Sequence, residues 1–223
     1  MRRPVLGSPL LALALLLAHP AHAQGFHDDF NGTALDPLRW IVNPGSGTVT
    51  VASGKVRLSA ECGQQFPYIV AASNPFPTSG DYRVSIGFRY PNPQFGGNGM
   101  SVTIPGCNGY GCHPGLRIWQ DTCCGGLRFS NGSLTDTSFG PSYDTAPHVA
   151  EWTVIGNRWE FVLDGTLRSV TTFAQRPNGF WFGHPPYTYC PWTTQEIDFI
   201  TITPFLPTSA VRSNWARLKA IYR

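Results

Sequence analysis

The chain has 223 residues, of which 42% are hydrophobic and 13% charged, and its formal net charge at pH 7 is +3. The charge is unevenly distributed, since residues 24–204 hold 10 basic and 13 acidic residues while residues 205–223 hold four basic and no acidic ones. A main domain with a net charge of −3 (10 − 13) lacks the basic footprint of nucleic-acid binding, and this class is therefore excluded for it.

The N-terminus has the three regions of a signal peptide. Arg2 and Arg3 precede the apolar run Leu10–Ala18, and the small-residue pattern Ala21–Ala23 follows it. We therefore predict cleavage before Gln24 and a secreted or periplasmic product of 200 residues (223 − 23). The apolar run is shorter than the roughly 20 residues of a membrane helix, and no second run follows, so no transmembrane segment is predicted. A single uncut anchor is the alternative.

The body of the chain, residues 24–204, has the pattern of an all-β domain. Tyr82–Tyr90 alternates apolar and polar residues, which predicts a long strand with one buried face. Between Ala150 and Phe173, the dipeptides Gly156-Asn157 and Asp164-Gly165 separate three such runs, and both dipeptides favour tight hairpin turns. Many short strands joined by regular turns predict one β-sandwich or jelly roll, a fold that a chain of this length commonly forms.

Export favours disulfides over free thiols for the six cysteines. The turn-like sequence between Cys107 and Cys112 makes these two the favoured pair. Adjacent Cys123 and Cys124 would point to opposite faces of a strand, which predicts distant partners, with a vicinal bridge as the alternative. His113 leaves a zinc cluster as a weaker alternative, because paired zinc-ribbon spacings are absent. The predicted disulfide cysteines are Cys62, Cys107, Cys112, Cys123, Cys124 and Cys190.

The last segment, residues 205–223, differs from the body in its periodicity. Pro207-Thr208-Ser209 is a helix-start signal, and apolar residues then recur at helical spacing from Val211 to Tyr222. We predict a short basic amphipathic helix whose apolar stripe packs on the sandwich while its bases face the acidic body. The alternative is contact of the basic tail with an anionic polymer or lipid surface.

Three segments resemble one family in sequence and in order. Phe26–Trp40 is similar to the opening strand of laminarinase-like glucanases, the family 16 glycoside hydrolases of the concanavalin A-like superfamily. His148–Gly165 resembles the central hairpin of that family, and Glu196–Ile202 resembles its closing strand. The resemblance implies a concanavalin A-like jelly roll. It does not imply one chemistry, because the superfamily contains lectins, adhesion modules, hydrolases and lyases.

The catalytic acids of the glucanases have no counterpart in the matching region. Those enzymes carry two carboxylic acids as Glu-x-Asp-x-x-Glu or Glu-x-Asp-x-Glu on one central strand. Here the region Leu116–Phe129 contains no glutamate, and Asp121 is its one acid. On an extended strand Asp121 shares a face with Arg117 and Trp119. No catalytic residue is therefore predicted.

A second acidic segment, Glu196-Ile197-Asp198, begins like the catalytic motif. Ile200 or Thr201 stands where the final acid would be, so this strand provides no matched pair of acids. The resemblance implies that an aspartate of the closing strand helps to hold a structural calcium ion in several glucanases. Asp198 is therefore a candidate calcium ligand, with an ordinary hydrogen-bonded aspartate as the alternative, and no other cofactor is predicted to be required.

Aromatic and polar residues of two kinds of segment suit sugar binding, because sugar rings pack their C–H faces on aromatic planes. One is the ring-rich stretch Phe180–Trp192. The alternative for this stretch is that most of its rings cap the end of the sandwich under a Cys190 disulfide. The other is a polar strand face that would line a groove, unless its charges are simply solvated. The predicted carbohydrate-binding residues are Arg83, Arg89, Arg117, Trp119, Asp121, Trp181, His184, Tyr187 and Trp192.

Other catalytic classes lack their motifs, since neither a Gly-x-Ser-x-Gly elbow nor a phosphate-binding loop is present. The favoured hypothesis is a secreted non-catalytic carbohydrate-binding or surface-adhesion domain, with a polysaccharide or cell-surface glycan as partner. The alternative is a glycan-degrading enzyme, a glycoside hydrolase or polysaccharide lyase, with a non-standard site around Asp121, Arg117 and His184. Asn31 and Asn131 lie in glycosylation sequons.

Overall fold

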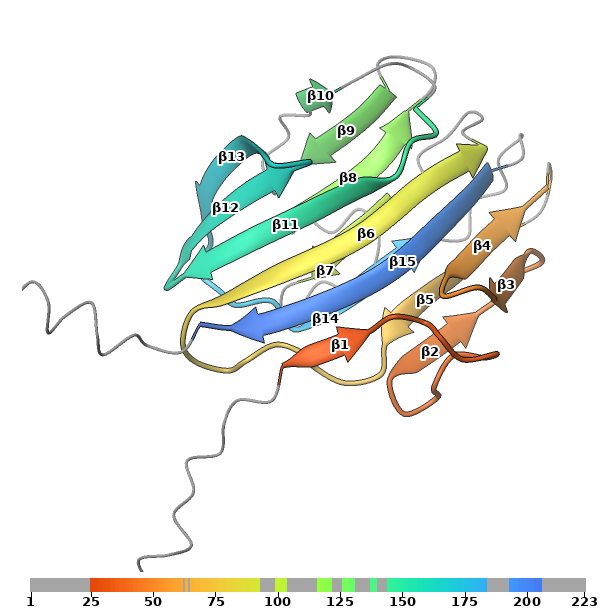
Figure 1. Ribbon diagram of the computed structural model, residues 1–223, viewed down its shortest axis with the longest axis horizontal. Coiled ribbons are helices and arrows are strands. Elements are labelled where there is room, and N and C mark those ends of the chain that lie inside the picture. The colour runs from red at the N-terminus through yellow and green to blue at the C-terminus, as the bar shows by residue number, and fades with distance from the viewer. Residues whose placement is uncertain are drawn as a thin grey trace, which may run out of the picture.

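The protein is a sandwich of two antiparallel sheets in the computed structural model (Figure 1). The structure describes residues 25–61, 63, 65–92, 99–103, 116–121, 126–130, 137–139, 144–183 and 193–205. Within these ranges every regular element is a strand. The strands are β1 (Phe26–Asp28), β2 (Trp40–Asn43), β3 (Thr48–Val51), β4 (Val56–Ala60), β5 (Tyr68–Ala71), β6 (Tyr82–Asn92), β7 (Gly99–Thr103), β8 (Leu116–Asp121), β9 (Gly126–Ser130), β10 (Thr137–Phe139), β11 (His148–Ile155), β12 (Arg158–Leu163), β13 (Thr166–Thr172), β14 (Gly179–Gly183) and β15 (Thr193–Pro204).

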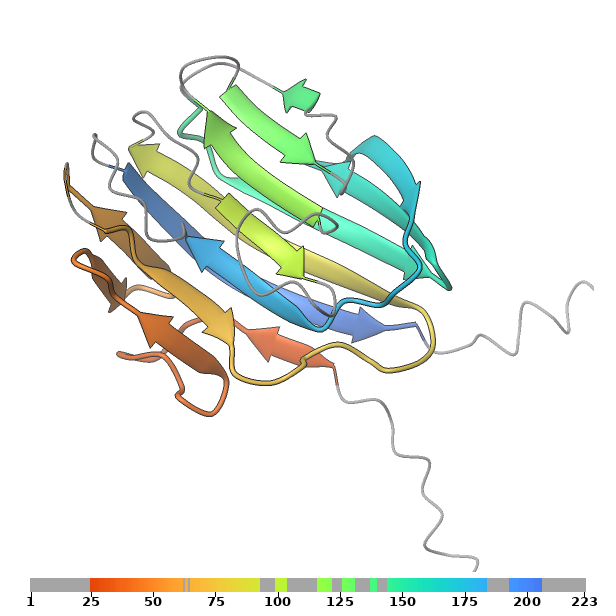
Figure 2. The same ribbon diagram turned by 180° about the vertical axis from the view of Figure 1, so that it is seen from behind.

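The two sheets lie one behind the other in the two opposite views (Figures 1 and 2). The eight-stranded sheet has the order β13-β12-β11-β6-β15-β4-β3, and β1 pairs with β15 beside this path. The seven-stranded sheet has the order β10-β9-β8-β7-β14-β5-β2. Of the 13 pairings among the described strands, six join consecutive strands and seven join strands that are separated in sequence, so both hairpins and long-range pairing assemble the sheets.

The hairpins of the predicted meander are present in β11, β12 and β13. Gly156 has a φ of 59°, and Asp164 and Gly165 have φ values of 50° and 75°. Positive φ at both central residues, as at Asp164 and Gly165, is the requirement of a type I′ turn, which matches the twist of the flanking strands. In the turn at Gly156-Asn157 the first central residue alone has positive φ, as in a type II′ turn. β6 likewise has the predicted alternation, because Tyr82, Val84, Ile86, Phe88 and Tyr90 are all buried.

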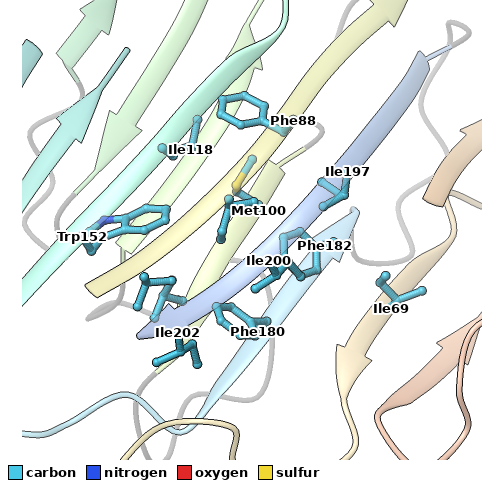
Figure 3. Close-up of a cluster of buried hydrophobic side chains, with 14 of the residues drawn as sticks. Ile69, Phe88, Met100, Ile118, Trp152, Phe180, Phe182, Ile197, Ile200 and Ile202 are labelled. Carbon is cyan, nitrogen blue, oxygen red and sulfur yellow. The ribbon is translucent and has the colours of Figure 1, made fainter. Parts of the chain in front are cut away.

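The core fills the space between the sheets with alternate residues of each strand (Figure 3). Ile86, Ile197 and Ile200 come from the eight-stranded sheet, and Phe180 and Phe182 come from the seven-stranded sheet. Because successive side chains of a strand point to opposite faces, each buried residue also fixes which of its neighbours faces outward. This rule defines the two outer faces of the sandwich.

The first and last described strands lie side by side. Phe26 of β1 pairs with Ile202 of β15, and Asp28 pairs with Ile200. The carboxylate of Asp28 accepts hydrogen bonds from the Trp40 indole at 2.7 Å and from the Phe30 backbone N–H at 3.0 Å. These bonds fix the chain where it turns away from β1.

The outer face of the eight-stranded sheet contains a glycine that a neighbouring ring covers. Gly87 of β6 pairs with Phe199 of β15, and a Cβ at Gly87 would lie within 2.7 Å of the Phe199 ring carbon Cδ1 and closer still to Cε1. We predict that Gly87→Ala lowers the free energy of unfolding by about 1–3 kcal/mol, because the ring must leave its position.

Chemical denaturation of Gly87→Ala and of the double variant Gly87→Ala/Phe199→Leu measures this effect. The smaller leucine should recover part of the lost stability. An unchanged unfolding midpoint in the single variant would show that the Phe199 ring moves aside without cost.

Several predicted features lie outside the described residues. They are the signal peptide, all six cysteines and the tail beyond Phe205, so disulfides, export and the C-terminal helix stay predictions. Among the described residues, no helix has the length and apolar character needed to span a membrane.

Candidate functional site

Two aromatic side chains are stacked on the outer face of the seven-stranded sheet. Ile69 of β5 and Phe180 and Phe182 of β14 point into the core, so Tyr68 and Trp181 point outward. The centroids of the Tyr68 and Trp181 rings are 4.3 Å apart, and their planes differ by 16°. Both rings are half-buried.

The stacking fixes the direction in which the rings face. The two rings come from the neighbouring strands β5 and β14, and their planes are nearly parallel. The line that joins the two ring centroids is therefore roughly perpendicular to both ring planes. Tyr68 covers one face of Trp181, and the other face is directed toward β7. The Tyr68 hydroxyl accepts a hydrogen bond from Asn43 Nδ2 at 2.9 Å, which holds the phenol ring. Trp181 Nε1 is buried and has no acceptor in the described structure.

The register places small residues beside this aromatic pair. Tyr68 pairs with Gly183 of β14, Gly183 pairs with Gly99 of β7, and Gly99 pairs with Trp119 of β8. Two adjacent positions between Tyr68 and Trp119 therefore have no side chain. Ser101, the partner of Trp181 on β7, is also small.

The predicted residues of β8 lie in the same sheet as Trp181. Trp119 is at the register position next to Gly99, and Arg117 is next to Ser101. Asp121 pairs with Gly126 at the end of β8. Trp181, Arg117, Trp119 and Asp121 therefore belong to one sheet.

Arg83 and Arg89 are not brought together with these residues. Both lie on β6, in the eight-stranded sheet, whose outer face is on the opposite side of the sandwich. The groove that would combine them with Arg117 and Trp119 is not formed, because sheet order separates the two sets. Arg83 lies 4.0 Å from the carboxylate of Glu151 and over the Phe205 ring.

Arg89 belongs to an ion-pair cluster around Glu196, which is 1% exposed. Arg89 Nε donates to one carboxylate oxygen at 2.5 Å, and Arg57 Nε donates to the other at 2.9 Å. Burial alone would raise the pKa of Glu196, but the hydrogen bonds and charges of Arg89 and Arg57 outweigh it and hold that pKa below its usual value. The same contacts raise the pKa of Arg89, with the hydrogen bond from Arg89 to Glu196 as the largest cause. Glu196 is thus an ionised structural residue.

The contacts of Asp198 do not fit a calcium site. Lys55 Nζ lies 3.0 Å from Asp198 Oδ1 and 3.8 Å from Glu196. A calcium ion needs six to eight oxygen ligands and is repelled by an adjacent ammonium group. Across the part of the chain that the structure describes, no group of three or more His, Cys, Asp or Glu residues is arranged to hold a metal.

The remaining predicted residues of the aromatic loop, His184, Tyr187 and Trp192, lie outside the described residues. Sequence analysis missed Tyr68 and Asn43. Tyr68–Ala71 is a continuous apolar run, so no alternation in the sequence directs Tyr68 outward. The contact of Tyr68 with Trp181 depends on the pairing of β5 with β14.

Comparisons with solved structures identify the architecture. The carbohydrate recognition domain of Emp47p matches with a TM-score of 0.58 at 12% identity, over 83% of this chain and 97% of that one. A β-1,3-1,4-glucanase (lichenase) derived from a mouse hindgut metagenome matches with a TM-score of 0.56 at 15% identity, over 81% and 99%. The CBM2 module of the evolved Dit of Lactobacillus casei BL23 phage J-1 has a TM-score of 0.55 at 16% identity, over 79% and 93%.

The fold is concanavalin A-like. The fold expected from the three sequence segments is confirmed, including its likeness to glucanases. No protein-family model matches the sequence, and a search of curated proteins gives no significant match. A recognition domain, a binding module and a glucanase share this concanavalin A-like frame, so the frame alone does not distinguish binding from hydrolysis.

Proposed function

We propose that the chain is an exported, non-catalytic carbohydrate-binding or adhesion domain that holds a glycan on the outer face of its seven-stranded sheet. The observation that carries the proposal is the Tyr68–Trp181 pair beside Gly99 and Ser101 of β7, positions that have no side chain or a small one. A flat indole face next to a gap in the side-chain layer suits the C–H face of a sugar ring.

The spacing of the strands suits one sugar ring in this gap. β14 and β8 are separated by β7 alone, and Trp119 is in register with Gly183, two residues along β14 from Trp181. The two tryptophan positions are therefore about 12 Å apart at a strand spacing of roughly 4.8 Å and a rise of roughly 3.3 Å per residue. A sugar ring over β7 would lie beside Trp181 and above Ser101 and Gly99. Its hydroxyl groups would meet polar groups of the face.

The acid content of the sheet favours binding over glucanase chemistry. Among the seven strands of this sheet, Asp121 is the one acidic residue. Hydrolysis in the glucanase manner needs two carboxyl groups about 5–5.5 Å apart in retaining enzymes. Glu196 and Asp198 belong to the other sheet and are paired with cations there.

An enzyme on glycans is the second candidate function. It is favoured by one observation, the presence of Asp121 and Arg117 on the same strand of the aromatic sheet. A hydrolase or lyase with a non-standard site would use these residues together with His184.

The decisive experiment compares Trp181→Ala with Phe205→Ala on a panel of polysaccharides. Phe205 is 37% exposed and follows β15 of the other sheet, so it is the matched control. We expect Trp181→Ala to weaken retention about tenfold or more, because a stacking surface is lost, while Phe205→Ala binds normally. Gly99→Val should also weaken binding by filling the gap, with both rings retained.

Release of reducing or unsaturated ends is recorded in the same assay. Retention without turnover supports the binding function. Turnover that is abolished by Asp121→Asn would show that the protein is an enzyme instead. Equal retention of Trp181→Ala and Phe205→Ala on the polysaccharides would show that the glycan does not bind at Trp181.

A further inference from the structure

We propose that the C-terminal segment, residues 206–223, docks in an apolar groove at the open edge of the sandwich. The groove has a volume of about 450 Å³ and is lined by Ala34, Leu35, Val42, Val49 and Val51 with two threonines. It is called the edge groove below. The proposal concerns a contact within the chain and is independent of glycan binding.

The edge groove lies where both sheets end. β3 is the last strand of the eight-stranded sheet, and β2 is the last strand of the seven-stranded sheet. Val49 and Val51 of β3 and Leu35 pack against the core but are only partly buried, and Val42 of β2 is 42% exposed. Within the described structure no further strand covers this edge of the core, so a contiguous apolar surface remains for an additional segment.

Acidic residues flank the edge groove. An adjoining cavity of about 220 Å³ shares Ala34 and Leu35 with it and is lined by Asp28, Asp29 and Asp36. Arg39 lines the same cavity, with Nε 3.7 Å from Asp36. Three carboxylates and one guanidinium leave a net charge of −2 (1 − 3) beside the apolar surface.

The tail has the complementary chemistry. Its apolar residues Val211, Trp215, Leu218 and Tyr222 recur at helical spacing, which predicts one apolar stripe. Its charged residues are all basic, namely Arg212, Arg217, Lys219 and Arg223. An apolar stripe bordered by bases fits an apolar groove bordered by carboxylates, and the ion pairs would orient the segment.

The tail is long enough to reach the edge groove. The described chain ends at Phe205, five residues after Ile200, which pairs with Asp28. Five strand residues span about 17 Å. The 18 residues after Phe205 (223 − 205) extend to at most roughly 60 Å, or about 27 Å as a helix. Covalent linkage gives the tail an effective concentration in the millimolar range, so it is favoured over a second copy of the chain.

Hydrogen exchange of the full-length chain tests the docking twice, once with a variant of the groove measured on the tail and once with a variant of the tail measured on the groove. The groove variant is Val42→Glu, and its matched control is Val170→Glu, because Val170 is 46% exposed on the opposite edge strand β13. Of these two variants, we expect only Val42→Glu to raise the rate of hydrogen exchange in residues 206–223, by about tenfold or more. The reason is that docking would then bury the glutamate charge against the apolar stripe of the tail.

The reciprocal variant is Trp215→Ser/Leu218→Ser, with Ser213→Ala/Asn214→Ala as its control. The first pair should raise exchange in the peptide that contains β3, and the control should not. Because these changes lie outside the strands, the test stands even if Val42→Glu unfolds the protein.

Two results would overturn the proposal. Tail peptides that exchange at the unprotected rate in the parent chain would show that no docking occurs. Protection of β3 that falls on dilution and ignores the tail variants would show that a second copy covers the edge groove instead.

Discussion

Replacing Gly183 by alanine is expected to lower the free energy of unfolding by at least ~2 kcal/mol. Gly183 has a φ of 103°, in the region that residues with a Cβ avoid. A Cβ there would also collide with the carbonyl oxygen of Pro67 and lie 2.9 Å from Tyr68 Cα. Both are backbone atoms, one in β5 and one directly before it, and cannot rotate away. Denaturant unfolding monitored by circular dichroism measures the loss.

Gly165→Ala is the matched control for this prediction. Gly165 also has a positive φ, 75°, but nothing lies within 4 Å of its added Cβ. The control therefore isolates the conformational cost, about 1 kcal/mol, from the collision. Equal losses in the two variants would show that the close approach of β14 to β5 is not required for stability.

Replacing Glu196 by glutamine is expected to destabilise the protein by about 1–3 kcal/mol at neutral pH. The carboxylate is nearly fully buried and accepts hydrogen bonds from Arg57 and Arg89, so its loss leaves two guanidinium groups facing a neutral amide. Lys55 lies 3.8 Å from the same carboxylate and adds to the repulsion. The partial exposure of the cations keeps the loss below that of a fully buried pair.

The pH dependence of this loss has a defined sign. The pKa of Glu196 is lower in the folded protein than in the unfolded chain, where it is about 4.3. Its stabilising contribution is therefore complete above that value and is lost as the pH falls through the folded pKa. The unfolding free energies of the parent and Glu196→Gln should converge in acid and differ at pH 7.

Glu160→Gln is the control for Glu196→Gln. Glu160 accepts a 2.7 Å hydrogen bond from Arg158, and the Arg158 side chain is 58% exposed, so this pair is worth at most about 1 kcal/mol. A gap between parent and Glu196→Gln that stays constant down to pH 2 would contradict the assignment of an ionised, stabilising Glu196.

Local sequence patterns predict the turns and the buried faces of single strands, because these features depend on residues that are close together in the sequence. Asp164-Gly165 predicts its turn because positive φ favours these residue types, and the alternation in Tyr82–Tyr90 predicts the buried face of β6. Neither signal states which sheet a strand joins. The sequence therefore predicts one groove for Arg83, Arg89 and the residues of β8, whereas β6 lies in the other sheet.

The candidate site was predictable in part for the same reason. Trp181 was selected because rings are concentrated around it, and this signal is contained in a short segment. The stacking of Trp181 on Tyr68 and the row Gly183–Gly99–Trp119 depend on the pairing of β5, β14, β7 and β8. These strands lie far apart in the sequence, so no local pattern contains the site.

The pairing of β1 with β15 has a practical consequence for how the molecule can be handled. Phe26 and Ile202 are partners, so the chain enters and leaves the sandwich at neighbouring points of the eight-stranded sheet (Figure 1). A tether joined next to Phe26 or to Phe205 would therefore hold the protein by the strand ends of β1 and β15 and by neither outer face. On a sensor chip or a bead, the Trp181 face would stay open to a dissolved ligand.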